Sequence, residues 1–175
     1  ALREPELYGL VGPGSDPGAR EAVLAGFSSE ADVLASVDHP QILKFWGVCY
    51  ARPGADGVRL PKWIVTERQP HSLDAFIRLP RVGPLLGPSD VLCLSLDMAE
   101  GLQFLHSKGI LHRDLKPKNV LVGPSGAKLA DLGTAKMIGI AAATAQHTVG
   151  PGTAIYHPPE ALGGEYSAKI DTFSL

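Results

Sequence analysis

The sequence contains few cysteines, little excess charge of either sign and no long hydrophobic run. Its two cysteines, Cys49 and Cys93, stand alone rather than in CxxC pairs, so neither a zinc site nor a disulfide framework is indicated. The 16 Lys and Arg residues against 18 Asp and Glu residues argue against a strongly basic nucleic-acid-binding domain. The longest weakly polar stretch, residues 137–145, is too short to cross a membrane. No GxxxxGK[ST] phosphate-binding loop occurs, which disfavours a nucleotide hydrolase of that class.

The remaining composition is that of a packed domain. The chain has 175 residues, 45% hydrophobic and 19% charged, enough for one domain or part of one. The charged first residues carry no signal peptide, and we expect a cytoplasmic protein. The apolar-rich last residues, 170–175, show no helix stop, so we expect a fragment of a longer domain.

Hydrophobic periodicity and turn residues predict an alternation of short strands and helices. Ser28 or Ser29 is the predicted cap of the first helix, Ser72 of the second and Ser89 of the third. Residues 131–160 show no convincing period, and irregular segments of that length are usually functional. The predicted elements are helices over 27–37, 72–79 and 89–107 and strands over 42–50, 63–66, 120–122 and 128–130.

The segment of residues 111–122 concentrates chemistry in a loop between a long helix and a short strand. Phosphoryl transfer needs a carboxylate at the attacking hydroxyl, a cation near the moving phosphoryl group and oxygen ligands for Mg²⁺. Asp114 suits the first role, Lys116 the second and Asn119 the third. Asp131 follows a predicted strand, and closure of the hairpin between 120–122 and 128–130 would bring it close to Asn119.

These residues resemble the active-site motifs of eukaryotic protein kinases. Residues 112–119, HRDLKPKN, match the HRDLxxxN catalytic loop, and residues 131–133, DLG, resemble the DFG motif with Leu for Phe. Residues 152–160, GTAIYHPPE, resemble the segment that ends in APE. The resemblance implies that Asp114, Lys116, Asn119, Asp131 and Thr153 act in catalysis, with Thr153 bonded to Asp114 and Lys116. It also implies that Asn119 and Asp131 bind the metal.

The resemblance covers essentially the whole chain and implies further roles. Glu30 corresponds to the glutamate of helix C, and Thr66 to the gatekeeper residue at the hinge. Asp171 corresponds to the aspartate of helix F that braces the catalytic loop, and His112 is expected to pack and hydrogen-bond rather than act as a base. The expected ATP-binding residues are Arg3, Glu30, Thr66, Glu67, Gln69 and Leu121.

The implied fold is α+β and bilobal, as in protein kinases. Residues 1–69 would form a partial N-lobe and hinge, with a small antiparallel sheet and helix C. Residues 70–175 would form a partial helical C-lobe that ends at helix F. The implied cofactors are ATP and Mg²⁺, and the implied partner is a protein substrate with Ser or Thr hydroxyls. No nucleic acid and no membrane segment are expected.

The sequence departs from the family at its N-terminal end. The glycine-rich loop GxGxxGxV is absent, and the first lysine is Lys44, which lies after helix C. Arg3 stands best in the place of the strand-3 lysine, although arginine differs from lysine in geometry. The alternative is that strands 1 to 3 lie upstream. Two functions therefore remain open: a serine/threonine kinase domain, and a non-catalytic pseudokinase or truncated scaffold module.

Two finer expectations concern subclass and regulation. Lys116 and Thr153 match serine/threonine kinases, whereas helix C and the hinge favour the tyrosine-kinase-like branch. Arg113, beside Asp114, could receive a phosphate that an upstream activating kinase places on Thr144 or Thr148. The alternative is a loop with no modification. Cys49 is expected to be a small buried residue.

Overall fold

The computed structural model describes residues 2–3, 17–52, 60–80, 86–137, 154–159 and 167–175. The chain forms two compact units. The first unit comprises residues 1–38 and 44–68, and the second comprises residues 39–43 and 69–175. The first unit has one described helix and one sheet, the second has several helices and two sheets, and each is described separately.

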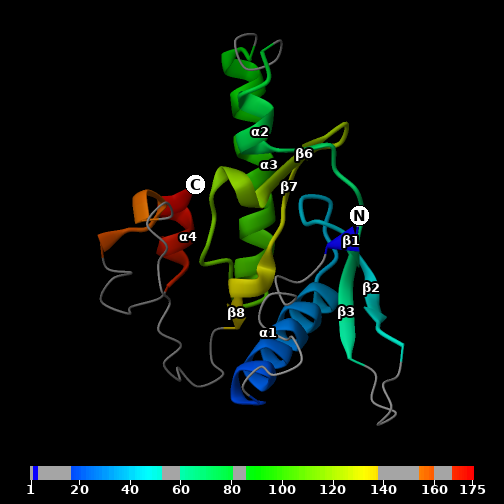
Figure 1. Cartoon of the computed structure of the whole chain (residues 1–175). Coiled ribbons are helices and arrows are strands. Elements are labelled where there is room, and N and C mark those ends of the chain that lie inside the picture. Colours follow the sequence, from blue (N-terminus) through cyan, green and yellow to red (C-terminus); the bar gives the residue numbers. More distant parts are fainter. Residues whose placement is uncertain (1, 4–16, 53–59, 81–85, 138–153, 160–166) are drawn as a thin grey trace. The chain divides into compact units, whose positions relative to one another are not determined.

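The first unit is built on a three-stranded antiparallel sheet in the order β1 (Leu2–Arg3), β3 (Pro61–Thr66), β2 (Phe45–Tyr50), shown in Figure 1. The strands predicted over 42–50 and 63–66 pair with each other in antiparallel fashion, with Val48 opposite Ile64 and Cys49 opposite Trp63. On β3, Ile64 is 3% exposed and Thr66 8%. This two-residue alternation is that of a strand with one buried face.

Helix α1 (Pro17–Ser36) packs against β2 and β3 within the first unit. It begins ten residues before the predicted start at residue 27. Pro17 occupies the first helical position, where its missing N–H and fixed φ cost nothing, and residues 19–25 are mostly good helix formers. Phe27, Leu34 and Val37 have helical spacing in the predicted helix and are buried, whereas Ala31 at the same spacing is half-buried.

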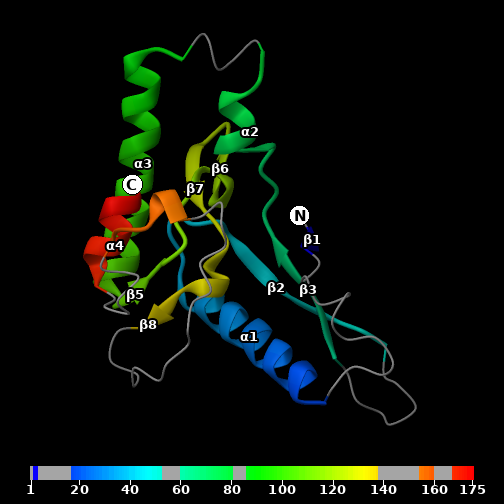
Figure 2. The same cartoon turned by 60° about the vertical axis from the view of Figure 1, so that its left-hand side comes forward.

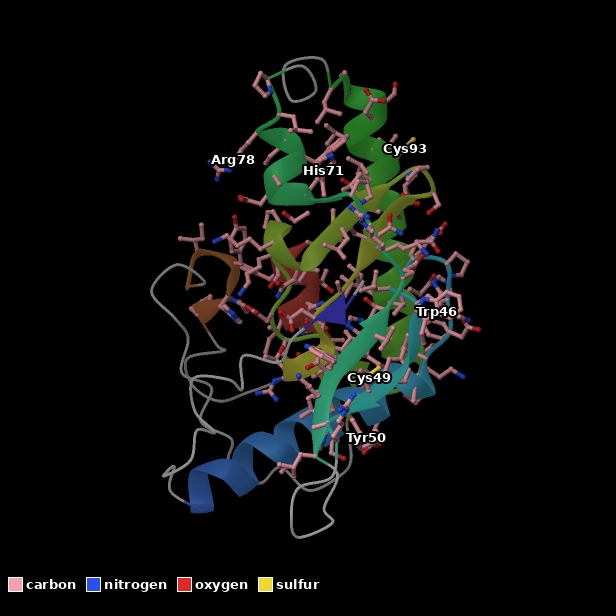
Figure 3. All side chains as sticks on the ribbon, turned by 45° about the vertical axis from the view of Figure 1, so that its right-hand side comes forward. Trp46, Cys49, Tyr50, His71, Arg78 and Cys93 are labelled. Atoms are coloured by element: carbon pink, nitrogen blue, oxygen red, sulfur yellow. The ribbon has the colours of Figure 1, made fainter. Side chains whose placement is uncertain are left out.

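Strand β2 begins at Phe45 rather than at residue 42. Ile42 instead forms a parallel bridge with Leu129 in the second unit, and the Leu43 amide donates to the Leu129 carbonyl at 2.9 Å. The expectation of a buried Cys49 is wrong, because β2 is an edge strand and Cys49 is exposed, as are Trp46 and Tyr50 (Figure 3).

The second unit contains helices α2 (Leu73–Ile77) and α3 (Pro88–Ser107). Ser72 caps α2 as predicted, since its Oγ accepts from the Ala75 amide at 3.2 Å. The predicted cap Ser89 of α3 is wrong. Gly87 is the cap residue, and its amide donates to Asp90 Oδ2 at 2.9 Å. Pro88 then occupies the first helical position, one residue before the predicted start.

The apolar residues at helical spacing along α3 are only partly buried. Leu105 is fully buried, whereas Leu92 and Leu96 are 60% and 53% exposed. The buried side of the helix is centred on Gly101, Leu102 and Leu105. A Cβ on Gly101 would lie 3.0–3.1 Å from Leu129 and the Gln41 carbonyl, so glycine permits the close approach of the helix to its neighbours.

A second three-stranded sheet has the order β4 (His71–Ser72), β6 (Val120–Gly123), β7 (Gly126–Leu129). The predicted β6–β7 hairpin is confirmed, with Gly123 opposite Gly126. Asp97 of α3 anchors its turn, because Asp97 Oδ2 accepts from the Ala127 amide at 2.8 Å. The hairpin therefore rests on the long helix.

The remaining elements frame the catalytic loop. Strand β5 (Ile110–Leu111) pairs with β8 (Lys136–Met137), and helix α4 (Ala168–Ser174) lies beside α3 in both Figure 1 and Figure 2. The segment predicted to be irregular contains short 3₁₀ turns η4 (Leu132–Thr134) and η5 (Ala154–Tyr156), and another, η3 (Pro117–Asn119), precedes β6. None of the helices described is long and apolar enough to cross a membrane.

Candidate active site

The catalytic loop, residues 112–119, is tied to α4 through Asp171. This carboxylate is 1% exposed and accepts from the His112 amide, through Oδ2, and the Arg113 amide, through Oδ1, both at 2.8 Å. His106 Nε2 of α3 lies 2.8 Å from the same Oδ2. Arg113 has φ 68°, a conformation that costs free energy in non-glycine residues. The predicted bracing role of Asp171 agrees with these bonds.

His112 is a structural residue, as expected. Its ring is fully buried, with Nε2 3.1 Å from the Ala130 carbonyl and Nδ1 3.4 Å from the Asp114 amide. These partners fit the neutral ring, in which Nε2–H donates and Nδ1 accepts. Burial lowers the pKa of His112 below its usual 6.5, against the opposing influence of Asp171.

Three predicted catalytic residues meet in this loop. Lys116 Nζ donates to Asp114 Oδ2 at 2.6 Å, and Asn119 Nδ2 donates to the same oxygen at 2.9 Å and to the Asp114 carbonyl at 2.8 Å. Both side-chain bonds go to Oδ2. The carboxylate is thus held in one orientation, in which Oδ1 receives neither of these two bonds.

Asn119 and Asp131 are neighbours through the backbone. The Ala130 amide donates to the Asn119 carbonyl at 2.9 Å, so Asp131 directly follows the residue paired with Asn119. The side-chain N–H₂ group of Asn119 donates both its hydrogens to Asp114. The side-chain oxygen is therefore the polar atom that remains for a metal ion. An amide oxygen and a carboxylate are hard ligands that suit Mg²⁺.

Within the described part of the chain, no three His, Cys, Asp or Glu side chains gather as a metal site. A Mg²⁺ ion at Asn119 and Asp131 would therefore take its other ligands from phosphates and water, which is how Mg²⁺ usually binds in nucleotide sites. Asp131 has the left-handed backbone angles φ 62° and ψ 63°. Leu132, which replaces the usual Phe, is 1% exposed and anchors the segment.

His157 is a site residue that the sequence did not reveal. Its Nε2 lies 4.0 Å from Asp114 Oδ1, and its side chain is 9% exposed. Its Nδ1 is buried, with no hydrogen-bond partner among the described residues. The residue stands inside the motif-like segment 152–160, yet no spacing rule connects it with Asp114. The structure alone brings the two together.

Comparison with known families agrees with this geometry. A family model for the protein kinase domain matches residues 18–175. The chain belongs to the protein kinase family. The predicted α+β protein-kinase fold is thereby confirmed, whereas assignment to the tyrosine-kinase-like branch stays a prediction.

The kinase domain is similar to several curated serine/threonine kinases. A probable serine/threonine-protein kinase of Dictyostelium discoideum is 38% identical over 83% of this chain and 23% of its own length. Serine/threonine-protein kinase pkn2 of Myxococcus xanthus is 33% identical over 90% of this chain and 19% of its own length. Dual specificity testis-specific protein kinase 1 of Rattus norvegicus is 32% identical over 83% of this chain and 23% of its own length. The chain thus spans about a fifth to a quarter of these relatives.

The expected ATP-binding residues of this kinase domain are distributed over both units. In the first unit, Arg3 lies on β1 opposite Ile64, and Glu30 is half-buried on α1. Thr66 is buried at the end of β3. In the second unit, Gln69 and Leu121 are half-buried.

Glu67, another expected ATP-binding residue, is already engaged with Lys44. Its amide donates to the Lys44 carbonyl at 2.9 Å, and its Oε1 accepts from the Lys44 amide at 2.7 Å. The ATP-binding roles of all these residues stay predictions.

Several sequence predictions fall outside the described residues: Thr153, Glu160 and the two candidate phosphorylation sites Thr144 and Thr148. A cavity of about 360 Å³ in the first unit lies between α1 and strands β2 and β3, lined by Phe27, Phe45 and Tyr50 among others. None of the predicted site residues lines it.

Proposed function

We propose that this chain is the catalytic part of an ATP- and Mg²⁺-dependent protein serine/threonine kinase. One observation carries the proposal: Asp114 is held by Lys116 and Asn119 through Oδ2 in a loop that Asp171 braces. Kinase relatives that match most of the chain support it. We also propose that it acts in the cytoplasm on Ser and Thr hydroxyls of other proteins.

In the proposed reaction Asp114 orients the substrate hydroxyl and accepts its proton. The hydroxyl oxygen forms a bond to the γ-phosphorus of ATP while the bond from that phosphorus to the ADP oxygen breaks. Lys116, at 2.6 Å from Asp114, lies where its charge can also stabilise the negative charge of the transferring group. Asn119 and Asp131 would hold Mg²⁺, which supplies neutralisation of the phosphate charges.

The test is phosphate transfer by the full-length protein carrying Asp114→Asn. We expect loss of at least about 10³-fold in kcat, because the proton acceptor and its charge are removed. Asp74→Asn is the matched control, since Asp74 lies in the same unit and its only described side-chain partner is the exposed Arg78. Wild-type activity in Asp114→Asn contradicts the assignment.

A second candidate is a non-catalytic binding module. The arginine at position 3, where the family's strand-3 lysine would stand, favours it. Because a ligand of the folded state raises its stability, Mg²⁺-ATP should raise the unfolding temperature of the wild-type kinase and raise that of Asp131→Asn less. A folded wild-type protein without any shift supports the binding module.

A
 further inference from the structure

We propose that His157 holds the acceptor hydroxyl of the substrate together with Asp114, and so acts as a substrate-positioning residue. The proposal deepens the proposed kinase function and rests on it. Its basis is the juxtaposition of His157 Nε2 and Asp114 Oδ1 at 4.0 Å. It also rests on the burial of the imidazole, since the His157 side chain is 9% exposed.

The separation of 4.0 Å is too long for a direct hydrogen bond but suits a bridging oxygen. For an oxygen about 2.8 Å from each of the two atoms, the angle from His157 Nε2 through the oxygen to Asp114 Oδ1 would be roughly 90°. That angle is compatible with one hydroxyl group donating to one atom and accepting from the other. Since Lys116 and Asn119 both bond Asp114 Oδ2, the bridged position faces the oxygen that they do not use.

The chemistry of the imidazole supports the same arrangement. With Nε2 facing a carboxylate, the hydrogen belongs on Nε2, because a lone pair there would oppose the lone pairs of Oδ1. The other ring nitrogen, Nδ1, is buried and lacks a described partner, and an unpaired buried N–H is rarer than an unpaired acceptor. Both considerations place a ring hydrogen on Nε2, directed toward Asp114.

In this arrangement the hydrogen and both lone pairs of the substrate hydroxyl each have a defined role. Its hydrogen goes to Asp114 Oδ1, one lone pair accepts from His157 Nε2–H, and the second lone pair is left to attack phosphorus. His157 would thereby orient the nucleophile without taking part in proton transfer. In the free enzyme a water molecule could occupy the same position, to be displaced by the substrate.

The test measures peptide binding without turnover. A serine peptide that the full-length wild-type protein phosphorylates is compared with its Ser→Ala copy, in the presence of Mg²⁺-ADP. We expect the wild type to bind the serine peptide at least about tenfold more tightly, with about three- to tenfold of this preference due to the hydrogen bond from His157. His157→Leu should lose the part of this preference that the His157 hydrogen bond supplies and keep the part due to Asp114, whereas His157→Gln, which keeps an N–H donor near the Nε2 position, should retain more of it.

Kinetics provide a second readout. His157→Leu should lower kcat/KM for the serine peptide about tenfold while leaving KM for ATP unchanged, and the unfolding temperatures of both variants verify that they fold. The inference is overturned if His157→Leu keeps the full Ser-over-Ala preference of the wild type, if His157→Gln loses as much of it as His157→Leu, or if the wild type shows none. A wild type that transfers no phosphate at all contradicts the kinase function instead.

Discussion

Replacing Asp171 by Asn should destabilise the kinase domain and misplace its catalytic loop. The carboxylate of Asp171 is 1% exposed and accepts three hydrogen bonds at 2.8 Å, from His112, Arg113 and His106. Asparagine has the same shape but one oxygen. If that oxygen stays with His112 and His106, the N–H₂ group must face the Arg113 amide, leaving a buried donor without an acceptor.

The loss can be worked out from these contacts. One hydrogen bond to a charged group contributes about 1.5–3 kcal/mol, and the remaining two bonds weaken when the charge is removed. We therefore expect the free energy of unfolding to fall by about 2–4 kcal/mol, a large share of the roughly 5–15 kcal/mol typical of domains. Because Arg113 precedes Asp114 directly, kcat should also fall by about tenfold or more.

Urea unfolding of the full-length protein, followed by circular dichroism, measures the change. Asp38→Asn is the matched control: Asp38 accepts from Lys44 Nζ at 2.7 Å, but its side chain is 75% exposed, so the loss should stay below about 1 kcal/mol. Equal midpoints for Asp171→Asn and Asp38→Asn would refute the reasoning that the buried carboxylate supports the loop.

Three further predictions follow from the structure and the sequence. Because the pKa of His112 is lowered in the folded state, the stability that the neutral ring contributes is complete above about pH 6.5. It is lost as the pH falls toward the folded pKa, by at most about 1.4 kcal/mol per pH unit. His112→Gln should therefore flatten the dependence of the urea midpoint on pH between 7 and 5, and an unchanged slope contradicts this. Gly126→Ala should lower the free energy of unfolding by about 1–2 kcal/mol, because Gly126 has φ +95° and a Cβ there would collide with the Asp97 carboxylate. Gly87→Ala is the control, because its Cβ would make only an ordinary contact at 3.6 Å with Asp90, and it should lower the free energy of unfolding by less than about 1 kcal/mol. Replacing Thr144 and Thr148 together by Ala should abolish activation by an upstream kinase in a peptide-phosphorylation assay; undiminished activation excludes both sites.

Much of the local structure could be predicted from the sequence. The β6–β7 hairpin follows from two apolar runs around a Gly-Pro-Ser-Gly turn, and Ser72 caps α2 because a serine before an apolar run satisfies an exposed helical amide. The boundaries were less predictable. The true caps of α3 involve Gly87 and Asp90, and Ser89, the more obvious candidate, lies inside the helix.

Burial was harder to predict than secondary structure. Leu92 and Leu96 share the apolar pattern of α3 but are exposed, and Cys49 is exposed on the edge strand β2. A pattern of apolar residues indicates which side chains can be buried. Which of them meet a neighbour depends on where other elements pack, and that is a property of the assembled chain.

The sequence by itself determined the order and spacing of the candidate catalytic residues: Asp114, Lys116 and Asn119 lie in one loop, and Asp131 follows the two strands β6 and β7 that come after it. This spacing suits the proposed phosphoryl transfer, which needs these groups close together. Only the tertiary structure decided what holds and surrounds them. Asp171 lies 59 residues from His112 in the chain yet receives its amide hydrogen bond, and His157 reaches Asp114 across more than forty residues. Such contacts depend on closing long loops, whose ends no short-range preference specifies.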